Sequence, residues 1–268
     1  RRDMIPTPAR GVLAGAAGLA VLILAWHVVA VTVYLRDNGT PGPVPPPLPV
    51  FARAATGLVD GAYAEGLAAT AGAALTGYGL AVVIALALGI LVMITPALGP
   101  FASQLGVVAA CAPAAAIAPI VVLLSPSGSR AVSVVLALLA VEFPLVVGVL
   151  LGLRSAAPAQ IDLVHAYGGG AWTAIRKVRV VSAIPALLAA LKLAAPAAFL
   201  GAMTGEFFTV GVDEGAGRLL ISQQYVGDYT GMWAIALLAT LVSALGYGAV
   251  AALGRVLAPW TAHTGSTR

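Results

Sequence analysis

The chain has very little charge and almost no cysteine, and each shortage excludes a class of protein. Charged residues make up 9% of its 268 residues, against about 25% in soluble globular domains. Apolar residues make up 60% and the mean hydropathy is +1.01, so a soluble fold would have too few polar side chains for its surface. The single Cys111 excludes an internal disulfide framework. The composition therefore predicts an integral membrane protein in contact with the lipid bilayer.

The signatures of metal sites, nucleotide sites and enzymes are also missing. His27, His165 and His263 lie on separate segments without the spacing of metal ligands, so no metal site is predicted. The two lysines, Lys177 and Lys192, do not follow a glycine-rich phosphate loop. No nucleophile elbow and no HExxH motif occurs, and no basic stripe or stacking platform suits nucleic acid. We therefore expect no catalysis, no cofactor and no nucleic-acid partner for this chain.

Six long apolar stretches predict six transmembrane helices in an all-α fold, since one span needs about 20 apolar residues. Prolines between the stretches act as helix breakers. The expected spans are residues 11–35, 67–94, 105–124, 131–153, 187–208 and 232–257. Between the first two, prolines cluster from Pro41 to Pro49. We expect residues 36–66 to be non-helical, either extended over the outer surface or a flexible tether.

The expected domain organisation has three parts. Residues 1–66 form an N-terminal transmembrane helix and a proline-rich external segment, residues 67–257 a membrane domain, and residues 258–268 a cytoplasmic tail. Six spans put both termini on one side, and most basic residues fall on that side, which the positive-inside rule makes cytoplasmic. These residues are Arg1, Arg2, Arg10, Arg154, Arg176, Lys177, Arg179, Arg255 and Arg268.

The loop after the fourth span has the pattern of two short helices joined by a glycine corner. Asp162 follows Pro158 in the first turn of the expected first helix, where a carboxylate is favourable. The glycines at 168–170 end that helix, because glycine adopts the required backbone angles freely. A second helix, residues 171–180, carries the basic cluster. Either the loop couples a transport channel to a soluble motor, or its charge only fixes the topology.

Residues 45–257 resemble the permease subunits of ATP-binding-cassette importers, in the nitrate, sulfonate and taurine branch. That family carries a cytoplasmic motif that begins Glu-Ala-Ala, has glycine four residues after the second alanine, and ends in Leu-Pro plus a further proline. Residues 162–164 stand at the Glu-Ala-Ala positions, Gly168 at the glycine and Pro185 at the second proline, whereas the valines 180–181 replace Leu-Pro.

The resemblance continues beyond this loop. Residues 148–155 are similar to the end of the family's fourth span, and residues 191–208 to its fifth, with Lys192 at a usual arginine and Glu206 at the customary acid. It implies a type I importer (MetI-like) permease fold with six transmembrane helices and cytoplasmic coupling helices, in a bacterial cell membrane.

The resemblance also implies partners and a contact site. Two separate ATPase subunits would hold ATP and Mg, a second permease, identical or paralogous, would complete the pore, and an extracytoplasmic binding protein would deliver a small nutrient such as a sulfonate, nitrate or a vitamin precursor. The residues expected at the ATPase contact are Asp162, His165, Ala166, Tyr167, Gly168, Gly169, Trp172, Arg176 and Pro185.

A few residues within the spans are candidates for the translocation path. Glu142 lies near the middle of the fourth span, where a carboxylate is costly unless paired or hydrated. It either faces the path or bonds to a carbonyl freed by Pro144. Prolines in the third span should kink it, for the path or for packing. The candidates are Pro113, Pro119, Glu142, Phe199, Met203 and Glu206.

The expected function is a permease subunit that forms half of an ATP-driven import pathway. The alternative is a proton- or ion-coupled secondary transporter with Glu142 as the ion site. Such transporters often contain internal repeats, and no convincing repeat relates the two halves of this sequence.

Overall fold

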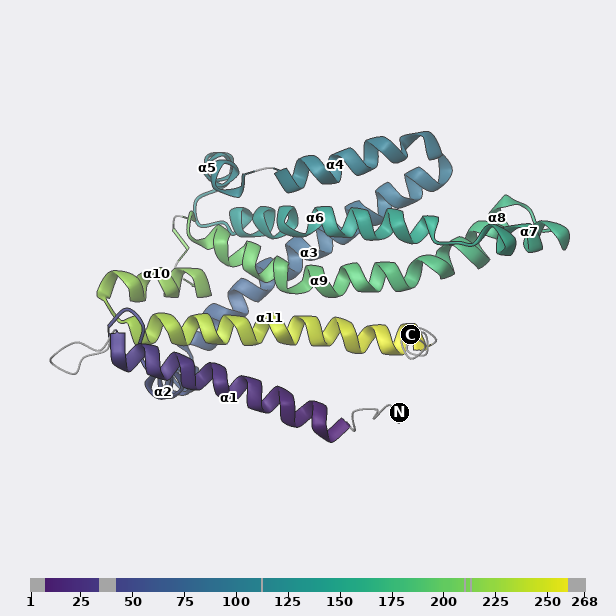
Figure 1. Cartoon of the computed structure of the whole chain (residues 1–268). Helices are drawn as coiled ribbons and strands as arrows, with labels where there is room; N and C mark the ends of the chain where they lie inside the picture. The colour runs from purple at the N-terminus through teal and green to yellow at the C-terminus, as the bar shows by residue number, and fades with distance from the viewer. Residues whose placement is uncertain (1–7, 34–41, 112, 210, 213, 260–268) are drawn as a thin grey trace. The chain divides into compact units, whose positions relative to one another are not determined.

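Helices form all the regular structure in the described part of the chain (Figure 1). The structure, a computed structural model, describes residues 8–33, 42–111, 113–209, 211–212 and 214–259. The helices are α1 (Pro8–Val33), α2 (Pro47–Val59), α3 (Ala62–Ile94), η1 (Pro96–Leu98), α4 (Gly99–Cys111), α5 (Ala114–Leu124), α6 (Ala131–Arg154), α7 (Pro158–Ala166), α8 (Ala171–Ala174), η2 (Ile175–Arg179), α9 (Val180–Glu206), α10 (Ala216–Val226) and α11 (Tyr229–Leu257). The all-α prediction is confirmed for these residues.

Five helices among the described residues are long and apolar enough to cross a bilayer. They are Leu13–Val33 in α1, then α3, α6, α11, and the continuous helix Ala171–Glu206 that α8, η2 and α9 form together. The chain is therefore a multi-pass membrane protein. The count of six spans is not confirmed, because the third expected span, residues 105–124, is divided between α4 and α5.

The division of the third expected span occurs at a proline. Pro113 has extended backbone angles (φ −72°, ψ 107°) and is the N-cap of α5. A proline lacks the N–H that would continue α4 and its ring collides with the preceding turn. At about 1.5 Å per residue, α4 and α5 are each shorter than the roughly 30 Å hydrocarbon core. We expected a kink here, and the structure has a break.

The prediction that residues 36–66 are non-helical is wrong for residues 47–59, which form α2, and for residues 62–66, which begin α3. Pro46 is the N-cap, and Pro47 and Pro49 are the first and third residues of the helix. The first N–H groups of a helix have no partner within it, so prolines in the first turn cost no hydrogen bond, and their fixed φ suits a helix start. Residues 36–41 of the expected segment lie outside the described residues.

The chain divides into two compact units, each built from separate stretches of sequence: residues 1–64 with 219–238, and residues 65–218 with 239–268. The second unit is centred on α6 and α9, which pack side by side (Figure 1). A Cβ at Gly205 would lie 2.5 Å from Ser133 Cα, and one at Gly152 would lie 2.9 Å from Ala183 O. These pairings make the two helices antiparallel and let their backbones approach closely through small residues.

The helix α3 also packs on α6 through glycine. A Cβ at Gly77 would lie 2.6 Å from Ala137 Cβ, and one at Gly89 would meet the side chain of Val149. Residue numbers rise together along both helices, so α3 and α6 run in the same direction. The connection between them, α4 and α5, also packs on α6.

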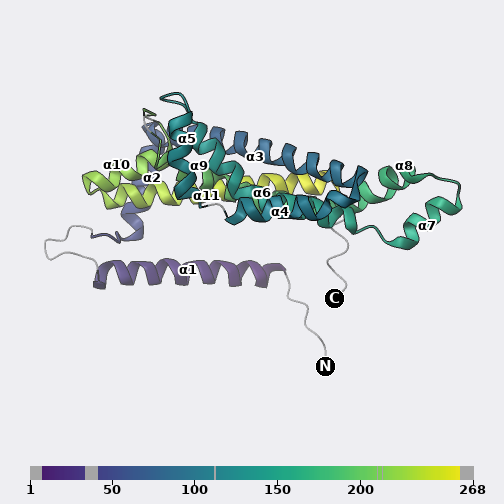
Figure 2. The ribbon, with the colours of Figure 1, turned by 90° about the horizontal axis from the view of Figure 1, so that it is seen from above.

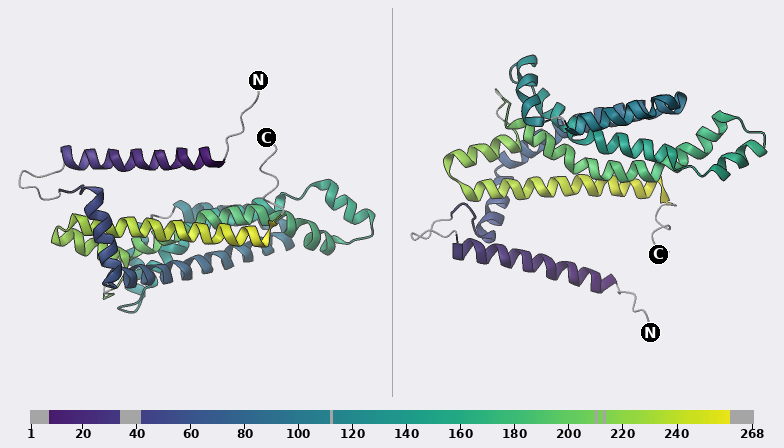
Figure 3. Two further views of the ribbon diagram at one scale, coloured as in Figure 1. Left: turned by 90° about the horizontal axis from the view of Figure 1, so that it is seen from below. Right: turned by 45° about the horizontal axis from the view of Figure 1, so that its top comes forward.

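The two ends of α6 and α9 carry different structures. The helices α7 and α8 extend beyond one end, and α5 lies at the opposite end (Figures 2 and 3). At the α5 end, Ala118, Val132 and Leu136 form a small apolar core, covered by Val121, Val122 and Phe208.

In the first unit, an aromatic cluster joins α1, α2 and the start of α11. The Trp26 ring stacks on Trp233 at 5.3 Å and meets Phe51 edge-on at 6.1 Å. The two indole N–H groups donate to backbone carbonyls before α2, Trp26 to Pro45 and Trp233 to Pro43, both at 3.0 Å. The prolines that lead into α2 are thereby attached to two membrane-spanning helices.

Candidate functional site

The glycine corner after α6 has the predicted geometry. Gly168 has a φ of +75°, the left-handed region that favours glycine. Its N–H donates to the carbonyl of His165, and the Gly169 N–H donates to that of Val164, both at 2.9 Å. This pair of bonds is a Schellman motif, which satisfies carbonyls left open at the end of a helix. We call residues 158–174 the α7–α8 corner.

Two details of the corner differ from expectation. Because α7 begins at Pro158, Asp162 is the fifth residue of the helix and lies just past its first turn. The second helix is not separate: α8 continues through the π-helical turn η2 into α9. The basic residues Arg176, Lys177 and Arg179 therefore lie at the base of a transmembrane helix, where cations commonly reach toward water.

Most residues predicted at the ATPase contact are exposed on the α7–α8 corner. Tyr167 is 86% exposed and Trp172 72%, and α7 has no buried residue; Leu163, which was not predicted at the contact, is 58% exposed beside them. Exposed large apolar side chains on a polar loop are typical of a binding surface. His165 Nδ1 lies 3.1 Å from the Gly169 carbonyl, which further ties α7 to the turn.

One predicted contact residue lies apart from the others. Pro185 is inside α9, about 20 Å along the helix axis from Ala171 at 1.5 Å per residue. It belongs to the shaft of the long helix, and the structure does not bring it to the α7–α8 corner.

A second polar site lies at the opposite end of α9, around Glu206. This carboxylate is 1% exposed. Its Oε1 accepts a hydrogen bond from Thr70 Oγ1 of α3, and its Oε2 accepts one from the Gly217 N–H of α10, both at 2.7 Å. The Ala216 N–H donates to Thr70 Oγ1 at 2.8 Å. Glu206 and Thr70 thus cap the first turn of α10, where a negative charge is favourable.

Arg130 adds the N-terminal end of α6 to this site. Its Nη1 lies 3.7 Å from Glu206 Oε1 and its Nη2 lies 3.9 Å from Glu214 Oε2. The fit around the acid is tight, because a Cβ at Gly215, whose φ is +153°, would lie 2.5 Å from Glu206 Cδ. We call Glu206, Thr70, Arg130, Ala216 and Gly217 the Glu206 cluster. It fastens α3, α6, α9 and α10 together.

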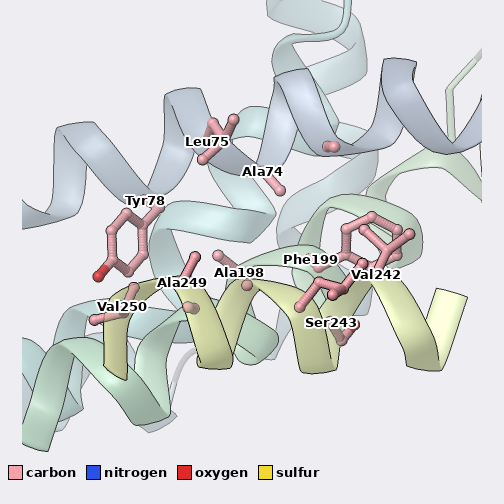
Figure 4. A pocket seen from close by; sticks show the side chains of 13 residues that line it. Ala74, Leu75, Tyr78, Ala198, Phe199, Val242, Ser243, Ala249 and Val250 are labelled. Atoms are coloured by element: carbon pink, nitrogen blue, oxygen red, sulfur yellow. The ribbon is translucent and has the colours of Figure 1, made fainter. Parts of the chain in front are cut away.

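The other residues proposed for the translocation path do not form one site. Phe199 lines an apolar cavity of about 380 Å³ between α3, α9 and the second half of α11 (Figure 4). Pro119 lines a different cavity with Leu123 and Phe208. Met203 is buried on α9, and Pro113 is the exposed N-cap of α5.

The cavity between α3, α9 and α11 offers few free polar groups. The Tyr78 hydroxyl donates to the Leu191 carbonyl at 3.1 Å, and Ser243 Oγ donates to the Ala239 carbonyl at 2.9 Å. The rest of its lining is alanine, glycine and larger apolar side chains. Such a surface suits an apolar occupant better than a small polar nutrient.

Glu142 is buried in the middle of α6, at 7% exposure. Within the described residues its Oε2 has no hydrogen-bond partner, and it does not line the cavity around Phe199. Its predicted role in the path stays a prediction.

Sequence reasoning found Glu206 and missed its partners. Thr70 is 136 residues away from Glu206, and Gly217 lies in the first turn of the next helix, α10, so no local pattern pairs them with the acid. In the described residues, no group of three or more histidine, cysteine, aspartate or glutamate side chains could hold a metal ion.

Comparisons with known proteins agree with one another. Residues 77–262 match the family model described as the binding-protein-dependent transport system inner membrane component. The chain is 28% identical over 243 residues to the formylaminopyrimidine transport permease protein ThiX of Halalkalibacterium halodurans, covering 90% of this chain and 92% of that protein. It is 35% identical over 115 residues to a probable ABC transporter permease protein of Haemophilus influenzae, covering 43% of this chain and 46% of that protein.

Proposed function

Because this chain belongs to the family of binding-protein-dependent transport system inner membrane components, it is a permease subunit of an ABC importer, and we propose that it forms half of the pathway and couples to ATPase subunits through the α7–α8 corner. The family implies ATPase and binding-protein partners. The observation that carries the coupling role is the exposed Tyr167 and Trp172 on a corner closed by a Schellman motif, beyond the end of the α6 and α9 pair.

The coupling role is tested at Gly168. A β-branched residue at its φ of +75° costs roughly 1–2 kcal/mol, or about a tenfold change in the equilibrium constant for closing the corner. In vesicles that contain the whole importer, Gly168→Val should lower uptake per ATP hydrolysed by about that factor and leave membrane insertion intact. Gly170→Ala is the matched control, because Gly170 has a φ of −81° and open space around it. Unchanged uptake in Gly168→Val would contradict the proposal.

We propose that the α7–α8 corner faces the cytoplasm. The distribution of charge supports this orientation. Arg154, Arg176, Lys177 and Arg179 gather at the corner end of α6 and α9, whereas Arg130 at the other end is balanced by Glu206 and Glu214. The positive-inside rule assigns the end with unbalanced basic residues to the cytoplasm.

We also propose that α4 and α5 together make the third of six crossings. The parallel direction of α3 and α6 supports it, because a chain that leaves one span and enters a parallel one must return across the bilayer between them. Despite the break between them, α4 and α5 then cross the bilayer as one span. Both chain termini lie on the same side under this count.

The pathway needs a second permease, either an identical copy or a paralogue. Native mass spectrometry of the purified importer distinguishes the two, since an identical copy adds a second subunit of 26.7 kDa. A complex that holds a single permease chain of any kind would contradict the half-pathway proposal.

For the substrate we propose a small polar heterocycle of the formylaminopyrimidine kind, because the relative that matches 90% of this chain is named for that transport. Uptake of labelled formylaminopyrimidine that requires ATP and the binding protein would support it. Uptake of taurine or nitrate in its place would favour the nitrate, sulfonate and taurine branch that was expected from the sequence. Uptake driven by a proton gradient without ATP would favour the secondary transporter instead.

A further inference from the structure

The helix α2 has three distinct faces. Its buried face packs into the first unit and consists of Pro47, Val50, Ala54 and Gly57. A polar side holds Arg53 and Thr56. A second apolar face, about a third of a turn away from the buried one, is exposed and consists of Leu48, Phe51, Ala55, Leu58 and Val59. A helix that only covered its own unit would need one apolar face.

The exposed apolar face is extensive. Leu48 is 76% exposed and Val59 86%, while Phe51 and Leu58 are near 40%. The face runs the length of the 13-residue helix, about 20 Å at 1.5 Å per residue. Surfaces of this kind are covered by another protein or by lipid.

The aromatic cluster fixes the depth of α2 relative to the spans of its own unit. Phe51 of α2 contacts Trp26, two turns before the end of α1, and Trp26 stacks on Trp233 in the first turns of α11. The ends of two spans therefore meet beside α2. Tryptophan is enriched at the boundary between hydrocarbon and water, so these rings place α2 at that boundary.

The polar side of α2 is held by its own unit. Arg53 Nη2 lies 3.4 Å from Asp228 Oδ2, and its guanidinium lies 5.7 Å from the Tyr63 ring. These contacts set the rotation of α2 about its axis. With the polar side anchored, the second apolar face stays turned outward.

The neighbouring helix α1 identifies what covers this face. Almost none of the α1 span is buried within the chain, and it is long and apolar enough to cross a bilayer, so we infer that acyl chains cover its apolar side chains. The exposed face of α2 adjoins a lipid-covered helix at the level where the hydrocarbon ends. A helix with one face on protein, one polar side and one free apolar face suits a position in the membrane interface.

We propose that α2 is an interfacial helix whose second apolar face, Leu48, Phe51, Ala55, Leu58 and Val59, dips into the acyl chains of the leaflet where α1 ends. The inference rests on the first unit alone and stands whether or not the α7–α8 corner contacts an ATPase.

Spin labels on α2 in bilayer vesicles test the proposal. Single cysteines replace Leu48, Ala55 and Val59 in the full chain with Cys111→Ser, and Thr56→Cys is the matched control on the polar side of the same helix. Collisions with oxygen, which concentrates in acyl chains, are compared with collisions with a water-soluble nickel chelate. We expect oxygen to dominate at 48, 55 and 59, and the chelate to dominate at 56.

Two results would overturn the proposal. Labels at 48, 55 and 59 that favour the nickel chelate would put the face in water, free for a binding protein. Labels that neither reagent reaches, with the partner permease present, would put it in a protein interface. All four positions are exposed in the chain, so the substitutions leave the packed face of α2 intact.

Discussion

Glu206 is an acid without access to water, and its hydrogen-bond partners come from distant parts of the chain. Thr70 and the Gly217 N–H each donate a hydrogen bond to it, and Arg130 lies within ion-pair distance. Removing a buried acceptor leaves its donors unpaired, which costs more than the bonds themselves contribute. The cluster is therefore sensitive to single changes.

Glu206→Ala should lower the free energy of unfolding by about 2 kcal/mol, because the buried Gly217 N–H loses its acceptor. Glu206→Gln should cost less, since its amide oxygen can still accept from Gly217 and Thr70 can donate to the Gly66 carbonyl instead. Denaturant unfolding in micelles measures both.

Glu214→Ala is the control for these variants. Glu214 is 64% exposed at 3.9 Å from Arg130, and exposed pairs contribute little. Equal losses of stability from Glu206→Ala and Glu214→Ala would show that the burial and hydrogen bonds of Glu206 do not matter.

At the scale of elements, α6 and α9 depend on glycines that leave no room for a side chain. A Cβ at Gly205 would lie 2.5 Å from Ser133 Cα and 2.8 Å from its nitrogen. These are backbone atoms, which cannot rotate away as a flexible side chain could. The seam between the two helices is thus set by backbone approach, as in other membrane bundles.

Gly205→Ala should destabilise the chain by roughly 1–3 kcal/mol, the usual cost of overpacking. Gly72→Ala in α3 is the matched control, since no atom lies within 4 Å of its Cβ position, and it should be neutral or stabilising by up to about 1 kcal/mol. Thermal unfolding of the two purified variants makes the comparison. If the two variants unfold with the same midpoint temperature, the contact between α6 and α9 can relax around an added Cβ, and the prediction is wrong.

The elements differ in how well sequence predicts them. The α7–α8 corner could be predicted from local sequence, because three consecutive glycines, residues 168–170, end the helix that precedes them. The helix α2 was missed because prolines act as breakers except in a first turn. A proline either kinks a helix or ends it, and packing against neighbouring helices determines which of the two occurs at Pro113. Sequence alone does not give that packing. The partners of Glu206 depend on the tertiary fold alone.

At the scale of the whole molecule, the α7–α8 corner and the loop before α6 should face opposite sides of the membrane. Tyr167 is the C-cap of α7 and Ser127 lies between α5 and α6, and both are exposed. The helices α7 and α5 lie at opposite ends of the α6 and α9 pair (Figure 2). With Cys111→Ser, an impermeant maleimide on intact cells should label Ser127→Cys and spare Tyr167→Cys.

Inverted membrane vesicles supply the control for that experiment, and the pattern should reverse there. Labelling of both cysteines from one side would contradict the crossing of the bilayer by α6, and labelling of Tyr167→Cys alone on intact cells would contradict the proposed orientation.

The helix Ala171–Glu206 is one unbroken piece of 36 residues, about 54 Å long at 1.5 Å per residue and nearly twice the hydrocarbon thickness. Its first turn carries Trp172 and its last residue is Glu206. If the α7–α8 corner couples to an ATPase as proposed, this helix would transmit a displacement of the corner to the Glu206 cluster. The π turn η2, Pro185 and Pro196 are the places where the helix can bend, so under that proposal their stiffness sets how much of the displacement is transmitted.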